Sequence, residues 1–317
     1  MKNIIIVASM LFWTSFVFAK DDSMVISLKT NQTVNFGDPV IVEITAIFGA
    51  PILSVNSHEP QDILSGRDVS MEWEIVSEDR IFTYRDILSV DLALEGESKT
   101  EYSGKAILLW KFTNVKGELQ HELIFDKPNS YSIVLKCKYG NEVAISSKSN
   151  IQVLESSKGK KALEILDSAK DWRYLLYGVF SQDDKTTILS KFDRVIDECD
   201  GTVIANICSA HLGNELFNDY QKNNSINKSR EMMLEGHPVD EQLLIKIKTL
   251  CNKGKHLDDG FAIRDDILFN LARLEFIYNN FDETFNLLDE IDKKHPSSKL
   301  HKQAQKAKDE LLKFKEK

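Results

Sequence analysis

Residue types that often carry catalysis occur in this chain without the spacing that catalysis requires. His121 is followed by Glu122, but an HExxH zinc helix needs a second histidine four residues after the first, and Phe125 stands there. The sequence shows neither a glycine-rich phosphate loop nor a Gly-x-Ser-x-Gly nucleophile turn. Acidic pairs such as Asp258-Asp259 fit loop and helix-start charges, although carboxylates from distant segments could still pair as in a hydrolase. We therefore expect no enzyme, no cofactor and no metal site.

Residues 1–19 have the pattern of a signal peptide. Lys2 supplies a positive charge, residues 4–18 are apolar, and residues 17–19 (VFA) are suited to a cleavage site. The apolar run is shorter than the roughly 20 residues that span a bilayer, so cleavage is favoured over retention as a membrane anchor. We expect a periplasmic or secreted protein that begins near Lys20 and has no integral membrane segment in its mature chain.

Charge and cysteine usage narrow the class of partner. The chain has 49 acidic and 40 basic residues and no basic stripe, which argues against nucleic acid as a partner. Cys137 is predicted on the inward face of a strand, and Cys199, Cys208 and Cys251 on apolar stripes of helices. None of them forms a CxxC motif. A structural disulfide among the three helical cysteines and buried free thiols both stay open for an exported chain.

Residues 20–154 alternate between apolar and polar side chains, as half-buried strands do. Val40, Val42 and Ile44 form one such set, and turn residues such as Gly37-Asp38-Pro39 separate it from its neighbours. Many short strands without a helical pattern predict an antiparallel β-sandwich. The run from Gly37-Asp38-Pro39 through Tyr131 to a last strand at residues 149–154 resembles the immunoglobulin-like modules of exported bacterial proteins.

After residue 154 the pattern changes. Residues 155–160 (ESSKGK) are polar and are predicted to be a linker with some hinge freedom between two independently folding domains. Residues 161–317 follow a helical period, and residues 265–314 are predicted to form three consecutive amphipathic helices. Asn279 and Asn280 are expected to end the first of these, because asparagine tolerates the left-handed conformation.

This last stretch resembles the tetratricopeptide repeat. The resemblance rests on Leu271-Ala272, on Asn280-Phe281-Asp282-Glu283 and on Pro296, and it covers about one and a half repeats of 34 residues. Two positions depart from the family pattern, since Thr284 replaces a small alanine and Glu275 replaces a tyrosine. The resemblance implies an array of helical hairpins, in which the first helix of each repeat lines a concave ligand surface.

The positions that match this ligand surface define the candidate site. They are Asp266, Phe269, Asn270, Arg273, Phe276 and Ile277. Phe269, Arg273 and Phe276 share one helix face, and aromatic and arginine side chains dominate binding hot spots. The alternative is that both phenylalanines pack on the preceding helix while Arg273 pairs with a nearby acid.

Three classes of function follow, in this order. The first is an exported binding or scaffold protein that holds a protein or peptide partner on its helical repeats. The second is a structural component of an envelope assembly that makes its contacts through the β-sandwich. The third is an enzyme of unrecognised type.

Overall fold

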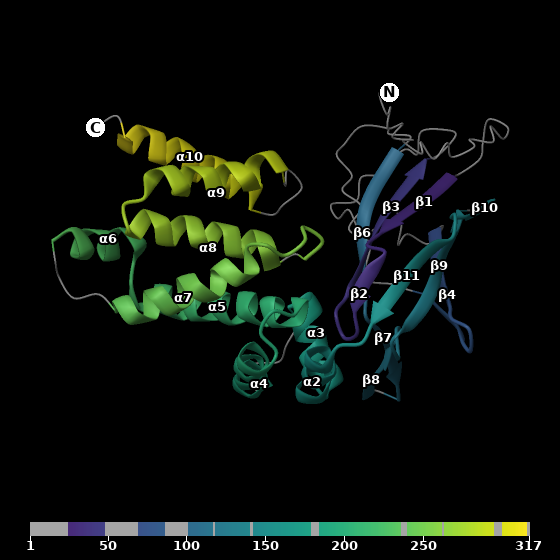
Figure 1. Cartoon of the computed structure of the whole chain (residues 1–317). Helices are drawn as coiled ribbons and strands as arrows, with labels where there is room; N and C mark the ends of the chain where they lie inside the picture. Colours follow the sequence, from purple (N-terminus) through teal and green to yellow (C-terminus); the bar gives the residue numbers. More distant parts are fainter. Residues whose placement is uncertain are drawn as a thin grey trace, which may run out of the picture.

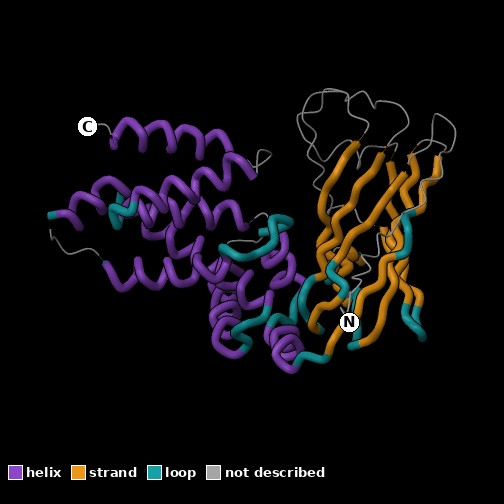
Figure 2. Tube along the Cα trace, turned by 45° about the horizontal axis from the view of Figure 1, so that its top comes forward, coloured by secondary structure: helices purple, strands orange, loops and turns teal. Residues whose placement is uncertain are grey.

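A computed structural model describes residues 25–47, 69–85, 101–116, 118–139, 142–178, 184–235, 240–261, 263–294 and 300–315. Within these ranges the strands precede the helices, which confirms the predicted order of a β region followed by an α region. The two regions lie side by side (Figure 1), and Figure 2 shows strands and helices in separate parts of the molecule. The expected signal peptide and Pro296 lie outside the described residues. Among the helices that are described, none combines the length and the apolar character needed to cross a membrane.

Two sheets form most of the β region. The first has the antiparallel order β1 (Val25–Thr30), β3 (Val40–Ile47) and β6 (Glu101–Leu108). The second has the order β2 (Thr33–Asn35), β11 (Ser149–Leu154), β9 (Asn129–Tyr139), β4 (Val69–Val76) and β5 (Ile81–Arg85), with β10 (Glu142–Ile145) also paired to β9. Its pairs are antiparallel except for β2 and β11.

The predicted alternation explains how the two sheets meet. Val40, Val42 and Ile44 of β3 point inward and are buried, and they share one apolar core with Trp73 and Leu135 of the second sheet. Successive strand residues point to opposite faces, so one face of each sheet supplies this core. On the opposite face of the first sheet, Ile41 and Ile107 pack against the helical core.

A separate hairpin links this region to the helices. It consists of β7 (Trp110–Val115) and β8 (Glu118–Leu123), which pair only with each other among the described strands. The ring of Trp110 lies 5.2 Å from that of Trp172, and Leu109 is part of the helical core. The chain of the β region therefore contributes side chains to the core of the α region.

The described helices are α2 (Ser157–Ile165), α3 (Ala169–Tyr177), α4 (Lys185–Glu198), α5 (Val203–Asn223), α6 (Ile226–Leu234), α7 (Glu241–Gly254), α8 (Ile263–Ile277), α9 (Phe281–Lys294) and α10 (His301–Lys315). The three helices predicted over residues 265–314 correspond to α8, α9 and α10. Asn279 adopts a φ of 64°, which confirms the left-handed end expected after α8. Helices α5, α7, α8, α9 and α10 are stacked in succession (Figure 1), and each packs on its neighbours.

The predicted linker is corrected by the structure, because helix α2 begins at Ser157. The hydroxyl of Ser156 accepts a hydrogen bond from the backbone N–H of Gly159 at 3.0 Å and caps the helix. Gly159 lies so close to the β region that an added Cβ would be 1.7 Å from the carbonyl oxygen of Phe36. Serine and glycine at these positions therefore serve a helix cap and a close backbone approach, and the junction between the regions is packed.

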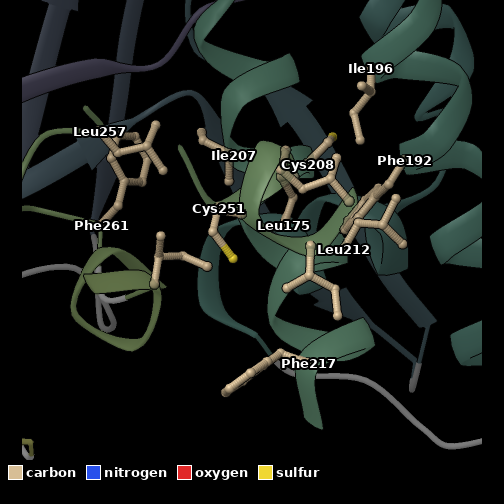
Figure 3. Packing of buried hydrophobic residues seen from close by; sticks show 14 of the residues in the cluster. Leu175, Phe192, Ile196, Ile207, Cys208, Leu212, Phe217, Cys251, Leu257 and Phe261 are labelled. Carbon is tan, nitrogen blue, oxygen red and sulfur yellow. The ribbon is translucent and has the colours of Figure 1, made fainter. Parts of the chain in front are cut away.

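The four cysteines are buried in the cores as free thiols. Figure 3 shows Cys208 and Cys251 among apolar side chains that include Phe192 and Phe217. Burial raises the pKa of Cys251 to about 12 and that of Cys137 to about 11. Of the two alternatives for the helical cysteines, the structure has the buried thiols.

Candidate binding groove in the helical region

A groove of about 800 Å³ lies in the helical region and is lined by residues of α5, α6, α8, α9 and α10. Its floor is apolar and includes Ala272, Leu288 and Leu311, which are buried, together with the half-buried Phe276. Polar and charged side chains, among them Gln221, also line it. An apolar cavity of this size with a few convergent polar groups is typical of a ligand site.

The groove brings together three of the residues predicted from the sequence. Phe269, Arg273 and Phe276 all line it, as their spacing on one face of α8 indicated. Another face of α8 carries Ile267, Leu271 and Leu274, which pack into the helical core, and Phe269 also belongs to that core.

The other three predicted residues do not line the groove. Asn270 is buried, and its side-chain amide donates to the side-chain oxygen of Asn214 on α5 at 2.8 Å. Ile277 belongs to the helical core. Asp266 is half-buried in the first turn of α8, where its negative charge is favoured by the helix dipole. Asn270 and Ile277 therefore hold α8 against the rest of the helical region and do not face the groove.

The alternative, in which both phenylalanines pack within the protein, is correct in part. Phe269 is only 8% exposed, and the ring of Phe276 meets that of Phe281 edge-on at 5.8 Å. The guanidinium of Arg230 from α6 lies 5.2 Å from the centre of the Phe276 ring. Both phenylalanines therefore pack within the protein and still present part of their surface to the groove.

Arg273 does not pair with an acid of the described chain, as that alternative required. Its Nη1 atom donates a hydrogen bond to the side-chain oxygen of Gln221 at 3.2 Å, and its guanidinium carbon lies 4.4 Å from the centre of the Phe269 ring. No carboxylate among the described residues forms a salt bridge with it. Burial lowers the pKa of Arg273, because the charged form loses solvation.

Sequence reasoning missed the contributions of α5, α6 and α10 to the groove. Ser225 and Ile226 at the start of α6 line it, as do Lys306 and Glu310 on the exposed side of α10. Thr284 offered one signal, since it departs from the repeat pattern and lines the groove, with its hydroxyl donating to the carbonyl oxygen of Asn280 at 2.8 Å. The remaining residues come from helices whose placement depends on the tertiary structure.

A buried polar cluster lies elsewhere in the helical core. Nε2 of His211 donates to the carbonyl oxygen of Leu175 at 2.9 Å, and the Tyr174 hydroxyl donates to Glu215 at 3.1 Å. Burial lowers the pKa of His211 to about 4, so the imidazole is neutral at physiological pH. Lys185 binds Glu215 in turn. These partners account for the cluster as internal hydrogen bonding.

The groove remains the best-developed candidate site of the described residues. In that part of the chain, no three histidine, cysteine, aspartate or glutamate side chains are placed to hold a metal ion. No protein-family model matches the sequence, and a search of curated proteins found no match.

Proposed function

We propose that this protein is an exported, non-catalytic binding or scaffold protein whose helical region holds a protein or peptide partner. The observation that carries the proposal is the groove, in which Phe269, Arg273 and Phe276 stand together over an apolar floor. Two aromatic side chains and an arginine are the residue types that dominate binding hot spots. The volume of about 800 Å³ lies within the range of about 300 to 1,000 Å³ that is usual for ligand sites.

The helical region is proposed to be a tetratricopeptide-like array, and the β region an immunoglobulin-like sandwich. The stacking of α8 on α9 and of α9 on α10 supports the first assignment. For the second, the hydroxyl of Tyr131 donates to the carbonyl oxygen of Lys127 at 2.8 Å, and Trp73 is buried between the sheets. A tyrosine bonded to the backbone just upstream and a buried tryptophan are both features of immunoglobulin domains.

The location of the protein follows from residues 1–19 and is proposed to be periplasmic or extracellular. The native protein is expected to begin at or near Lys20, which N-terminal sequencing or intact mass measurement would show. A native chain that still carries Met1 and fractionates with the membrane would contradict the proposal.

Site-specific photo-crosslinking in the native envelope tests the binding function. Gln303 and Lys302 are exposed neighbours on α10, but of the two only Gln303 lines the groove. A photoreactive residue at position 303 is expected to capture a partner, whereas the same residue at position 302 is the matched control. Equal capture from both positions, or from neither, would argue against a partner in the groove.

A single substitution connects that capture to the hot-spot residues. Arg273→Ala removes a guanidinium that the described chain does not hold in a salt bridge, so thermal stability should be nearly unchanged. Partner binding is expected to weaken by about 1 to 2 kcal/mol. Loss of thermal stability with unchanged binding by the folded fraction would show that Arg273 is a packing residue only.

A second candidate function is a structural role in an envelope assembly, with contacts made through the β region. It is favoured by the outer face of β10, where Val143 is 63% exposed and Ile145 is 60% exposed. The two side chains are two residues apart and so point to the same side of the strand. Crosslinking from position 143 that persists in the Arg273→Ala variant would favour this function over the groove.

A further inference from the structure

Arg273 carries information about the chemistry of the partner. Its guanidinium is half-buried in the groove, where its partners among the described residues are an amide oxygen and an aromatic ring. Neither partner carries a charge. A desolvated charge without an opposite charge is costly, and proteins usually pair such groups. The groove therefore holds a positive charge that has lost water and has not gained a counter-charge.

Several other half-buried cations of the same region show the usual arrangement. Each of these cations is bound to at least one carboxylate of a neighbouring segment. The pairs are Lys191 with Asp167 and Asp171 at 2.6 and 2.7 Å, Lys308 with Asp289 and Asp292 at 2.7 and 2.8 Å, Arg264 with Glu290 at 2.7 Å, and Lys248 with Glu275 at 2.8 Å. Arg273 differs from these cations in its lack of such a partner within the described chain, although the protein as a whole is acidic.

Among the described residues that line the groove, the one carboxylate is that of Glu310, and it has a cation beside it. Lys306 and Glu310 on α10 both line the groove and lie 3.9 Å from each other, so their charges offset one another. The groove also reaches Ser225 and Ile226 at the start of α6, a helix with no acidic residue in its first turn. The positive end of that helix dipole therefore favours an anion on the same side.

We propose that the groove binds an acidic peptide segment of a partner protein, in which one aspartate or glutamate side chain pairs with the Arg273 guanidinium. Apolar side chains that flank this carboxylate pack on Phe276, Leu288 and Leu311. The geometry of an arginine favours a carboxylate, which it can bind through two parallel N–H groups. This inference rests on the proposed peptide-binding function and adds the chemical class of the partner.

Matched peptide arrays test the inference with the mature full-length protein. One array displays short synthetic peptides with a central aspartate or glutamate between leucine and phenylalanine residues. The second array has asparagine or glutamine at the central position, with the same flanking residues. We expect the acidic peptides to bind about tenfold more tightly than their amide counterparts, and the difference to shrink as salt is added.

Protein variants locate the effect at one residue. Arg273→Gln should bind the acidic and the amide peptides equally, whereas Arg273→Lys should keep part of the preference because it keeps the charge. Arg194→Gln is the matched control, because Arg194 is exposed on α4 outside the groove and pairs with Glu198 at 3.3 Å. The arginine control should behave as the unmodified protein does. Thermal melting establishes that each variant is folded.

The outcomes separate the inference from the function on which it rests. Binding of both arrays with no preference for the acid would overturn the inference and leave the peptide-binding function intact. An acid preference that survives Arg273→Gln would also overturn it. Failure of the protein to bind any peptide of either array would overturn both the inference and the proposed function.

Discussion

The two ends of helix α5 differ in how nearby polar groups are satisfied. At its start, the hydroxyl of Thr202 accepts from the N–H of Ala205 at 3.1 Å, and the carboxylate of Asp38 accepts from the N–H of Val203 at 3.1 Å. Asp38 belongs to the β region, so one region of the chain caps a helix of the other. Toward the opposite end of α5, Gln221 lines the groove and binds Arg273.

The comparison shows where polar and charged groups have suitable partners within the protein and where a charged group has none of opposite charge among the described residues. At the first end, backbone N–H groups that a helix cannot satisfy internally find acceptors within the protein. At the second end, a charged guanidinium has only a neutral partner among the described residues. We call the start of α5, capped by Thr202 and Asp38, the closed end, and the end with Gln221 and Arg273 the open end. The closed end serves stability, and the open end is available to a partner.

The largest expected effect comes from the junction between the two regions. Trp172 is 0% exposed, its indole N–H donates to the carbonyl oxygen of Leu166, and its ring packs on Trp110 of the β7–β8 hairpin. Trp172→Ala should lower the free energy of unfolding by about 3 to 5 kcal/mol, because it leaves a cavity at the junction of the two regions.

Chemical denaturation followed by circular dichroism measures this change, with Arg273→Ala as the control at the open end. Strand and helix signals should shift together if the junction couples the regions. A loss below about 1 kcal/mol would mean that the junction relaxes to fill the cavity.

His211, near the middle of α5, should make stability depend on pH. Burial lowers its pKa from 6.5 to about 4, so the unfolded chain binds more protons in this interval. Its contribution to stability is therefore present above pH 6.5 and is lost as the pH falls toward about 4, by an amount of about 3 kcal/mol.

The measurement compares the free energy of unfolding of the native protein with that of His211→Gln across this interval, so that other titrating groups cancel. The difference in free energy of unfolding between the two proteins should narrow or change sign on acidification. A difference that stays constant with pH would show that the imidazole is not held neutral by burial.

The smallest expected effect concerns the cap from the β region. Asp38→Ala removes the acceptor of the Val203 N–H and should cost about 1 kcal/mol, whereas Asp38→Asn keeps an acceptor oxygen and should cost less. Burial raises the pKa of Asp38, although hydrogen bonds from Asn35 and Val203 lower it. The folded state therefore binds more protons, and the native protein should lose stability relative to Asp38→Asn as the pH rises above 3.8.

Urea unfolding of both variants at several pH values checks this sign. A native protein that gains stability relative to Asp38→Asn over the same rise would mean that the hydrogen bonds outweigh burial at this carboxylate. Equal stability of Asp38→Ala and the native protein would show that this contact between the regions contributes nothing, and that the cap by Thr202 is sufficient for the start of α5.

The sequence by itself determined the kind and order of the elements. The period of two in Val40, Val42 and Ile44 and the helical period of residues 265–314 depend on local geometry, so they could be read from residue spacing. The left-handed end at Asn279 follows from the residue type. The shared face of Phe269, Arg273 and Phe276 follows from helix geometry alone, and these three residues do line the groove.

Only the tertiary structure decided which faces were covered. Ser156 and Gly159 had the composition of a linker, but their positions depend on the approach of Phe36 from the β region. The burial of Asn270 and Ile277, both predicted for the groove, depends on where α5 and the core lie against α8. Helical spacing fixes which residues share a side of one helix. Contacts between segments distant in sequence fix which sides are buried, and they also left Arg273 beside a glutamine rather than a carboxylate.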